Sequence, residues 1–160
     1  MSVSIPSTVT SIGDDTFRDC SLLKEVSIPS SIKSIGNSAF SGCSSLTKIL
    51  IPSSVTSIGR FSFTCCQSLA EVSFEEPSLI SIENYVFSEC SSLKEILIPK
   101  SVTSIIFQAF YDCSLLTQVS FEPPSSLTTI ENDAFKKCSS LKTIIIQSSL
   151  SKLIKAGMKD

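Results

Sequence analysis

Histidine and tryptophan are both absent from this chain of 160 residues, and glycine occurs only five times. The lack of histidine excludes Ser-His and Cys-His nucleophile pairs, imidazole metal ligands and the side chain that most often changes charge near neutral pH. The few glycines form no phosphate-binding loop. We therefore expect no enzymatic activity, no catalytic residue, no metal site and no cofactor.

A strong net charge is also lacking. Lysine and arginine number 13 against 15 aspartates and glutamates, which gives a net charge of −2 and no basic field to attract nucleic acid or an anionic membrane. No run of 18 apolar residues predicts a membrane span, and residues 1–20 resemble no signal peptide. Neither a leader nor an anchor is visible, and the location stays open because a fragment of a secreted protein would show the same absences.

What the chain does contain is an internal repeat, in which phenylalanine recurs every 23 to 25 residues and cysteine and leucine follow at fixed distances. The phenylalanine column is Phe17, Phe40, Phe63, Phe87, Phe110 and Phe135; the cysteine column is Cys20, Cys43, Cys66, Cys90, Cys113 and Cys138; the leucine column is Leu23, Leu46, Leu69, Leu93, Leu116 and Leu141. Three columns with one spacing predict six repeats over about residues 3–146, within a single domain of residues 1–160.

Short segments rich in β-branched residues follow each leucine. Segments such as 26–28 and 49–51 alternate at period two, which predicts short strands whose outer residues point inward. Residues 3–5 fit the same frame and predict a seventh strand, and a second apolar pair in each repeat predicts another short extended piece. The column that begins with Asp14 and Asn37 is rich in Asp and Asn, which predicts the N-cap of a single helical turn.

A unit of this size cannot bury its apolar side alone, whereas stacked units bury a continuous core. The pattern Leu-x-x-[Ile/Val]-x-Ile-Pro-x-x-[Val/Ile]-x-x-Ile-Gly-x-x-Ala-Phe-x-x-Cys resembles the BspA-type leucine-rich repeat of bacterial surface proteins and anaerobic protozoa. The resemblance implies an α/β repeat: a right-handed leucine-rich-repeat solenoid with a parallel β-sheet on one face and short turns or helical pieces on the other. It also implies non-catalytic protein binding, commonly adhesion to host or matrix proteins.

The two ends of the predicted solenoid differ. Residues 148–158 place Leu150, Leu153 and Ile154 on one helical face, which predicts an amphipathic helical cap over the last repeat. The first repeat has no equivalent cap. Either the strand at 3–5 is an exposed edge prone to end-to-end self-association, or another element covers it.

The six in-register cysteines allow more than one interpretation. Their spacing is unlike that of the cysteine pairs in structural zinc sites, whereas stacked positions about 5 Å apart would permit disulfides. The favoured interpretation is a buried ladder of free thiols, because cysteine packs as a small hydrophobe. Cys65 lies outside the column, and a reactive role for it is the less favoured alternative.

The outward face of the predicted strands is a first candidate binding surface. Its mid-strand positions alternate small polar residues with the apolar Leu50, Leu97 and Ile145. Apolar residues exposed in a stripe either contact a partner or are tolerated at the surface. Carboxylates on the same face, Glu25, Glu71 and Glu95 beside Lys48, are expected to be solvated, because an open sheet offers no cleft for a glycosidase pair.

A second candidate surface lies on the turn side, where aromatic and apolar residues replace small or polar ones: Phe61, Tyr85, Ile106, Phe107 and Tyr111. Aromatic side chains are favoured anchors at protein interfaces, and the alternative is that they fold over and widen the core. Both surfaces predict a protein partner of unknown identity. The alternative function is an intracellular scaffold packed against a filament or another repeating assembly.

Overall fold

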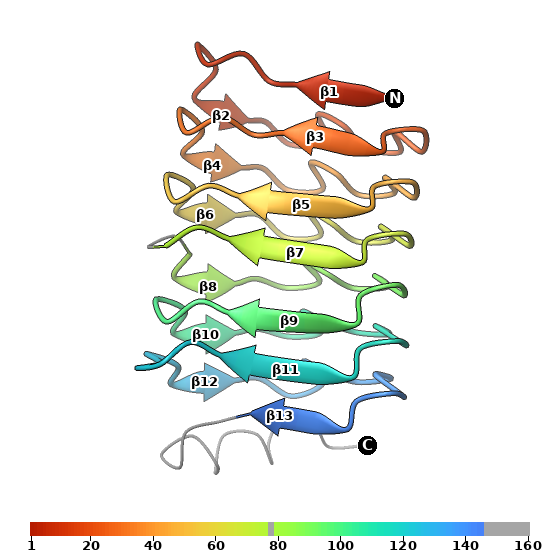
Figure 1. Ribbon diagram of the computed structural model, residues 1–160, viewed down its shortest axis with the longest axis vertical. Helices are drawn as coiled ribbons and strands as arrows, with labels where there is room; N and C mark the ends of the chain where they lie inside the picture. Colours follow the sequence, from red (N-terminus) through yellow and green to blue (C-terminus); the bar gives the residue numbers. More distant parts are fainter. Residues whose placement is uncertain (77–78, 146–160) are drawn as a thin grey trace.

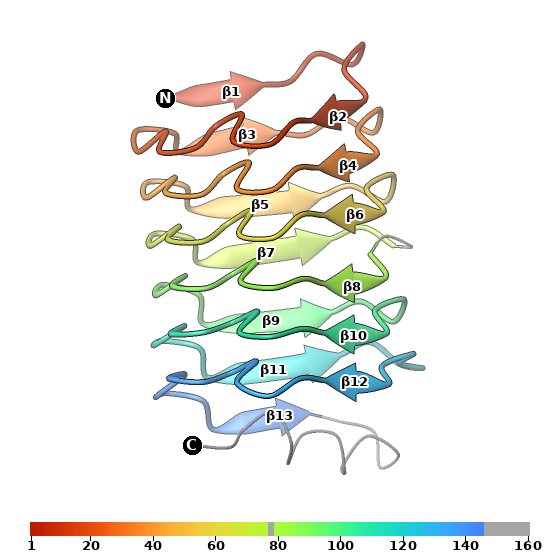
Figure 2. The same ribbon diagram turned by 180° about the vertical axis from the view of Figure 1, so that it is seen from behind.

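Among the described residues, seven longer strands run parallel along one face of the molecule, and six two-residue strands run along the opposite face (Figures 1 and 2). The structure is a computed structural model, and it describes residues 1–76 and 79–145. The chain winds through about six turns, which we call coils 1 to 6, each beginning with one longer strand. The predicted solenoid is confirmed, whereas the predicted cap at 148–158 lies outside the described residues.

The longer strands stack in register, as the repeat predicted. They are β1 (Ser2–Ser4), β3 (Glu25–Ser27), β5 (Lys48–Ile51), β7 (Glu71–Phe74), β9 (Glu95–Ile98), β11 (Gln118–Phe121) and β13 (Thr143–Ile145). Equivalent residues pair in parallel, as Ile49 does with Val72 and Val119 with Ile96. The hydrogen-bonded ladder is interrupted between β3 and β5 and between β7 and β9. Within β5 and β9 the second and fourth residues are buried and the first and third are exposed, which confirms the predicted alternation.

The second apolar pair of each repeat forms the short strands on the other face, as predicted. These are β2 (Ser11–Ile12), β4 (Ser34–Ile35), β6 (Ser57–Ile58), β8 (Ser81–Ile82), β10 (Ser104–Ile105) and β12 (Thr129–Ile130). They pair in parallel as two three-stranded sheets, β2-β4-β6 and β8-β10-β12. Their isoleucines are buried between the two faces, so both sets of strands cover one core.

The segment that carries each core phenylalanine is a series of turns, and the predicted helical turn is wrong, since the described residues contain no helix. About every second backbone N–H of this segment donates to the next coil: the N–H of Phe17 donates to Ala39 at 2.8 Å, and the N–H of Phe40 donates to Ser62 at 2.8 Å. Donors used in this way are not available for the i to i−4 bonds of a helix.

The Asp and Asn column does not cap helices. Its side chains bond to the next coil instead: the N–H of Asn37 donates to Asp14 Oδ1 at 2.7 Å, and the N–H of Arg60 donates to Asn37 Oδ1 at 2.9 Å. This contact requires glycine in the next coil, because a Cβ on Gly36 would lie 2.5 Å from the backbone nitrogen of Asp14. Close approach is therefore the reason for this glycine, whose φ is not positive.

Two repeats are longer than the others and carry short acidic insertions, which begin at Glu75 after β7 and at Glu122 after β11, at one edge of the solenoid. In the first insertion, both carboxylate oxygens of Glu76 are enclosed and accept no hydrogen bond from the described residues, and Lys100 Nζ lies 3.7 Å from Oε2. Burial, followed by the neighbouring carboxylate of Glu122, raises the pKa of Glu76. The charged form of Glu76 is thus disfavoured in the folded protein.

Replacing this carboxyl group should stabilise the protein at neutral pH. Because the pKa is raised in the folded state, protonated Glu76 favours folding at low pH, and that contribution is lost as the pH rises through the folded pKa. We expect Glu76→Gln to raise the Tm at pH 7 and to have little effect at pH 4. The control is Glu75→Gln, because Glu75 accepts a hydrogen bond from Ser53 that a glutamine can also accept. A lower Tm for Glu76→Gln at pH 7 would contradict this account.

Candidate functional site

The outward face of the longer strands carries two exposed leucines. Leu50 in β5 is 51% exposed and Leu97 in β9 is 48% exposed, because each occupies an outward position of its strand. Ser73, in the intervening strand, pairs in register with Leu50. Ile145, the third predicted apolar residue of this face, ends β13 and pairs in register with Ser120. We call this surface, with its carboxylates, the strand face.

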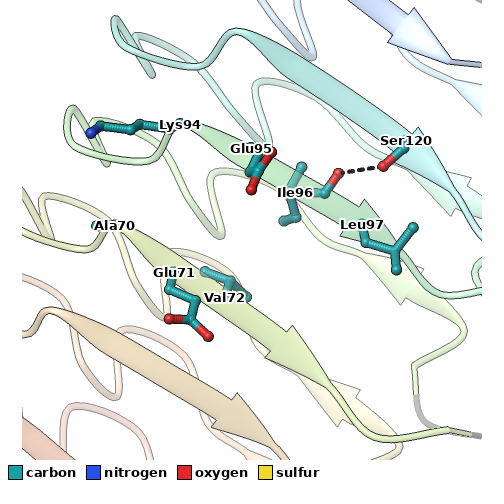
Figure 3. A pocket seen from close by; sticks show the side chains of 8 residues that line it. All are labelled: Ala70, Glu71, Val72, Lys94, Glu95, Ile96, Leu97 and Ser120. Atoms are coloured by element: carbon teal, nitrogen blue, oxygen red, sulfur yellow. Dashed lines mark hydrogen bonds between the residues drawn. The ribbon is translucent and has the colours of Figure 1, made fainter.

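Shallow pockets follow the strand face. One lies between β7 and β9, where the ladder is interrupted, and Figure 3 shows Glu71 and Glu95 on these neighbouring strands with Leu97 farther along β9. At its edge the Ser120 hydroxyl donates to the Ile96 carbonyl at 3.4 Å. A second pocket shares Glu71 with the first and extends to Leu50. The face thus combines apolar side chains and carboxylates along the solenoid axis.

The structure brings three predicted aromatic residues together on the turn side, and we call them the aromatic patch. The rings of Phe61 and Tyr85 stack at 4.7 Å between centroids, and Phe107 meets Tyr85 edge-on at 5.7 Å. Phe61 is 39% exposed, and none of the three belongs to the buried cluster of the core. They stack on one another outside the column of core phenylalanines.

The backbone at this patch is in a conformation that suits aromatic residues poorly. Phe61 has φ 61° and Tyr85 has φ 60°, in the left-handed region. Equivalent positions in the other coils share this conformation but carry Asp15, Ser38, Gln108 and Asp133. A bulky residue there is disfavoured by on the order of 1–3 kcal/mol, whereas short polar side chains are better tolerated. The fold alone therefore does not account for Phe61 and Tyr85.

The remaining predicted residues of this side lie in coil 5. Tyr111 is half-buried, and Lys137 Nζ lies 4.9 Å from its ring centroid, so this ring contacts coil 6. Ile106 is half-buried, and its N–H donates to the Ile82 carbonyl at 2.9 Å. Glu131, which the sequence reasoning missed, accepts a hydrogen bond from the N–H of Phe107 at 2.9 Å. In coils 2 and 3 this backbone N–H donates to an Asp or Asn side chain of the preceding coil, whereas in coil 5 it donates to a carboxylate of the next coil.

The cysteine column has a role beyond packing. Five thiols donate to the carbonyl oxygen of the phenylalanine in the preceding coil at 3.1 to 3.2 Å: Cys43 to Phe17, Cys66 to Phe40, Cys90 to Phe63, Cys113 to Phe87 and Cys138 to Phe110. All seven cysteines are free thiols. Burial raises the pKa of Cys43 to about 12 and raises the pKa of Cys66 and Cys90 as well. At neutral pH these thiols stay protonated and unreactive.

Cys65 lies outside the column and is half-buried. Its thiol contacts Glu89 Oε2 at 3.6 Å, and its pKa is raised by partial burial and then by the charge of Glu89. A raised pKa lowers the thiolate fraction, so the surroundings of Cys65 do not favour a nucleophile. Within residues 1–76 and 79–145, no group of three or more Asp, Glu or Cys side chains is placed to hold a metal ion. In the same part of the chain, no helix is long and apolar enough to cross a membrane.

The family of the chain follows from its similarity to known proteins. The sequence pattern of the BspA type leucine rich repeat region matches residues 1–117 and 73–157, in six copies. The chain belongs to the BspA-type leucine-rich repeat family. Repeats of this family generally form protein-binding or adhesion modules and are generally non-catalytic. No curated protein sequence matches this BspA-type chain.

Solved structures of bacterial leucine-rich repeat proteins share the fold. The leucine-rich repeat protein of T. pallidum is 34% identical over 89% of this chain, with a TM-score of 0.84, and 68% of its own length is covered. A protein from Bacteroides ovatus is 35% identical over 93% of this chain (TM-score 0.71), and one from Eubacterium ventriosum is 29% identical over 92% (TM-score 0.79). The BspA-type chain spans only 44% and 39% of these last two proteins.

The thiol ladder predicts a specific pattern of alkylation. At pH 8 without reductant, iodoacetamide should modify Cys65 and Cys20, which are half-buried, about tenfold or more faster than the five buried cysteines. In urea all seven should react, because unfolding exposes every thiol. Peptide mass spectrometry measures both patterns. Six cysteines still blocked in urea would show disulfides and contradict the ladder of free thiols.

Proposed function

We propose that this chain is a non-catalytic protein-recognition module that contacts its partner through the aromatic patch and the strand face. The observation that carries the proposal is the placement of Phe61 and Tyr85 in the left-handed region, stacked and outside the core. Disfavoured backbone conformations are concentrated at functional sites, where a side chain is needed for something other than folding. Exposed aromatic rings are the anchors that protein partners use most.

The strand face supports the same proposal from the other side of the solenoid. Leu50 and Leu97 are both exposed and lie two coils apart, which is roughly 10 Å at the spacing of parallel strands. Three carboxylates line the pockets of this surface together with two lysines: Glu25, Glu71 and Glu95 with Lys48 and Lys94. A partner that complements this face carries apolar side chains at that spacing, flanked by basic groups.

A more specific version of this proposal is that the chain takes part in adhesion at a cell surface. It rests on the family, in which adhesion is a general role. Two solved proteins share the fold: a leucine rich cell surface protein of Faecalibacterium prausnitzii at 24% identity and the pneumococcal vaccine antigen PcpA at 20% identity. At these identities the similarity concerns the fold alone. The alternative, an intracellular scaffold, has no observation of its own in its favour. Surface labelling of intact cells distinguishes the two locations.

Self-association is a separate prediction from the sequence. β1 pairs only with β3, so its outer edge has no strand partner in the part of the chain that the structure describes. Exposed strand edges favour pairing between copies. End-to-end self-association stays a prediction, and analytical ultracentrifugation of the purified chain tests it: a dimer would support it, and a monomer at all concentrations would contradict it.

The aromatic patch can be removed by restoring residues that other coils carry. Phe61→Ser copies Ser38, and Phe107→Asn copies Asn37. We expect the double variant to keep the far-ultraviolet circular dichroism of the parent and to bind its partner roughly 30-fold more weakly, as for the loss of an interface hot spot. The partner is identified by quantitative capture from native extract, and its Kd is then measured with purified protein.

A matched control and a second surface sharpen this test. Asp15→Ser changes the same column of the turn in coil 1, away from the aromatic patch, and should leave binding unchanged. Leu50→Ser with Leu97→Ser tests the strand face separately. Equal Kd values for the parent and for both double variants would overturn the proposal. Unfolding of the Phe61→Ser, Phe107→Asn variant would instead show that these rings support the core.

A further inference from the structure

One column of the turns carries aromatic rings that stack at the spacing of the coils. Phe61 of coil 3 and Tyr85 of coil 4 occupy equivalent positions, and their rings lie within 8° of parallel with centroids 4.7 Å apart. That distance matches the spacing of adjacent parallel strands, which is about 4.8 Å. The column therefore offers a place for one planar group per coil along the solenoid axis.

The stack of rings ends at Phe61. On its far side Phe107 covers Tyr85 edge-on at 5.7 Å. Towards coil 2 the next residue of the column is Ser38, which has no ring. Phe61 is the one aromatic side chain among the described residues that is exposed, whereas the others are half-buried or buried. The face of the Phe61 ring that points to coil 2 thus has no stacking partner among these residues.

We call the place above Ser38, next to the free face of Phe61, the open position. Ser38 has the same left-handed backbone conformation as Phe61, so the direction of the column continues through coil 2. The next residue of the column is Asp15 in coil 1, two coils from Phe61, which is about 10 Å at the strand spacing. This is twice the distance at which Phe61 and Tyr85 stack. The open position therefore has room for a single ring.

The charges around the open position favour a ring without charge. Coil 1 carries three exposed carboxylates and one cation beside it: Asp14, Asp15, Asp19 and Arg18. These carboxylates already have donors, because Asp14 accepts the N–H of Asn37, and Arg18 lies 3.1 Å from Asp15 and 3.7 Å from Asp19. A phosphate would be repelled by the excess of negative charge, and a cationic ligand would lie beside Arg18.

We propose that the open position receives an aromatic side chain of the protein partner, which stacks on the free face of Phe61 as the third ring of the column. This inference rests on the proposed function and names the group that the partner contributes. Stacked rings are favourable at centroid distances of about 4.5 to 7 Å, a range that includes the spacing of the column. The left-handed conformation of Phe61 then has a purpose, because it aligns the ring with the column and presents one face to the partner.

A soluble aromatic probe tests the open position without the partner. N-acetyl-L-tryptophanamide is titrated into residues 1–160 while backbone amide NMR signals are followed. We expect saturable shifts at the amides of Ser38 and Phe61, caused by the ring current of the indole, with a Kd of about 1–10 mM. N-acetyl-L-leucinamide is apolar but has no ring, and it should shift these amides at least about fivefold less.

Three results with these probes would overturn the proposal. The first is the absence of saturable shifts with the tryptophan probe up to about 50 mM. The second is an equal effect of the leucine probe, which would show that any apolar group binds. The third is tighter binding of adenosine monophosphate or choline at the amides of Ser38 and Phe61, which would favour a nucleotide or a cation as the ligand.

Variants that fill or remove the open position make the test specific. Ser38→Phe places a ring of the chain itself there, and Phe61 and Tyr85 show that the column accepts a ring at this φ. We expect the far-ultraviolet circular dichroism of the parent and at least about tenfold weaker probe binding, because Asp15 occupies the next place. Phe61→Ser should cause the same loss without adding a ring. Asp133→Phe, at φ 64° in coil 6, is the matched control and should leave the Kd unchanged. Equal effects of Ser38→Phe and Asp133→Phe would contradict the proposal.

Binding of the partner separates this inference from the proposed function. Both expect the Phe61→Ser, Phe107→Asn variant to bind the partner more weakly. Only this inference expects Ser38→Phe, which enlarges the aromatic patch, to weaken partner binding as well, by about tenfold or more. Parent affinity of Ser38→Phe beside weak binding by the double variant would overturn the inference and leave the proposed function in place. Parent affinity of the double variant would remove the aromatic patch from the proposed function, even where the tryptophan probe binds.

Discussion

The carbonyl oxygens of the first five core phenylalanines join adjacent coils. The Phe17 carbonyl accepts the N–H of Cys20 within its own coil and the thiol of Cys43 from the next coil, both at 3.1 Å. Phenylalanine rings stack beside these bonds at 5.1 to 5.5 Å between centroids. The cysteine thiol, the phenylalanine carbonyl and the phenylalanine ring must therefore recur at the same spacing in every coil. The core positions of the repeat vary little for this reason.

Much of the fold could be predicted from the sequence, because strands and columns follow from periodicity. The role of Asp14 and Asn37 could not be predicted, because Asp and Asn are favoured both at a helix N-cap and in a hydrogen bond to the next coil. Once the backbone donors are used between coils, no helix can form in the turn. The residues of the aromatic patch could be predicted because they replace small or polar residues at repeat positions. The left-handed backbone conformation of Phe61 could not be predicted from the sequence. Glu76 was missed because nothing in the repeat indicates the path of an insertion.

We propose that partner binding by this chain depends on residues that depart from the repeat. Residues that follow the repeat are explained by stacking, since each fills the same place in every coil. Phe61 and Tyr85 occupy a backbone position where Ser38 and Asp15 are better tolerated, and Leu50 is exposed where Ser27 or Ser73 would suffice. Proteins commonly give up some stability where binding requires it.

The most direct test of this central claim is the thermal unfolding of a chain in which the departures are reversed. Five substitutions restore residues found in other coils: Leu50→Ser, Leu97→Ser, Phe61→Ser, Tyr85→Ser and Phe107→Asn. The account predicts one cooperative transition at a Tm no lower than that of the parent, because two disfavoured backbone positions are relieved and no core contact is lost. A Tm lower by more than about 10 °C would contradict it, by showing that these side chains hold the fold together.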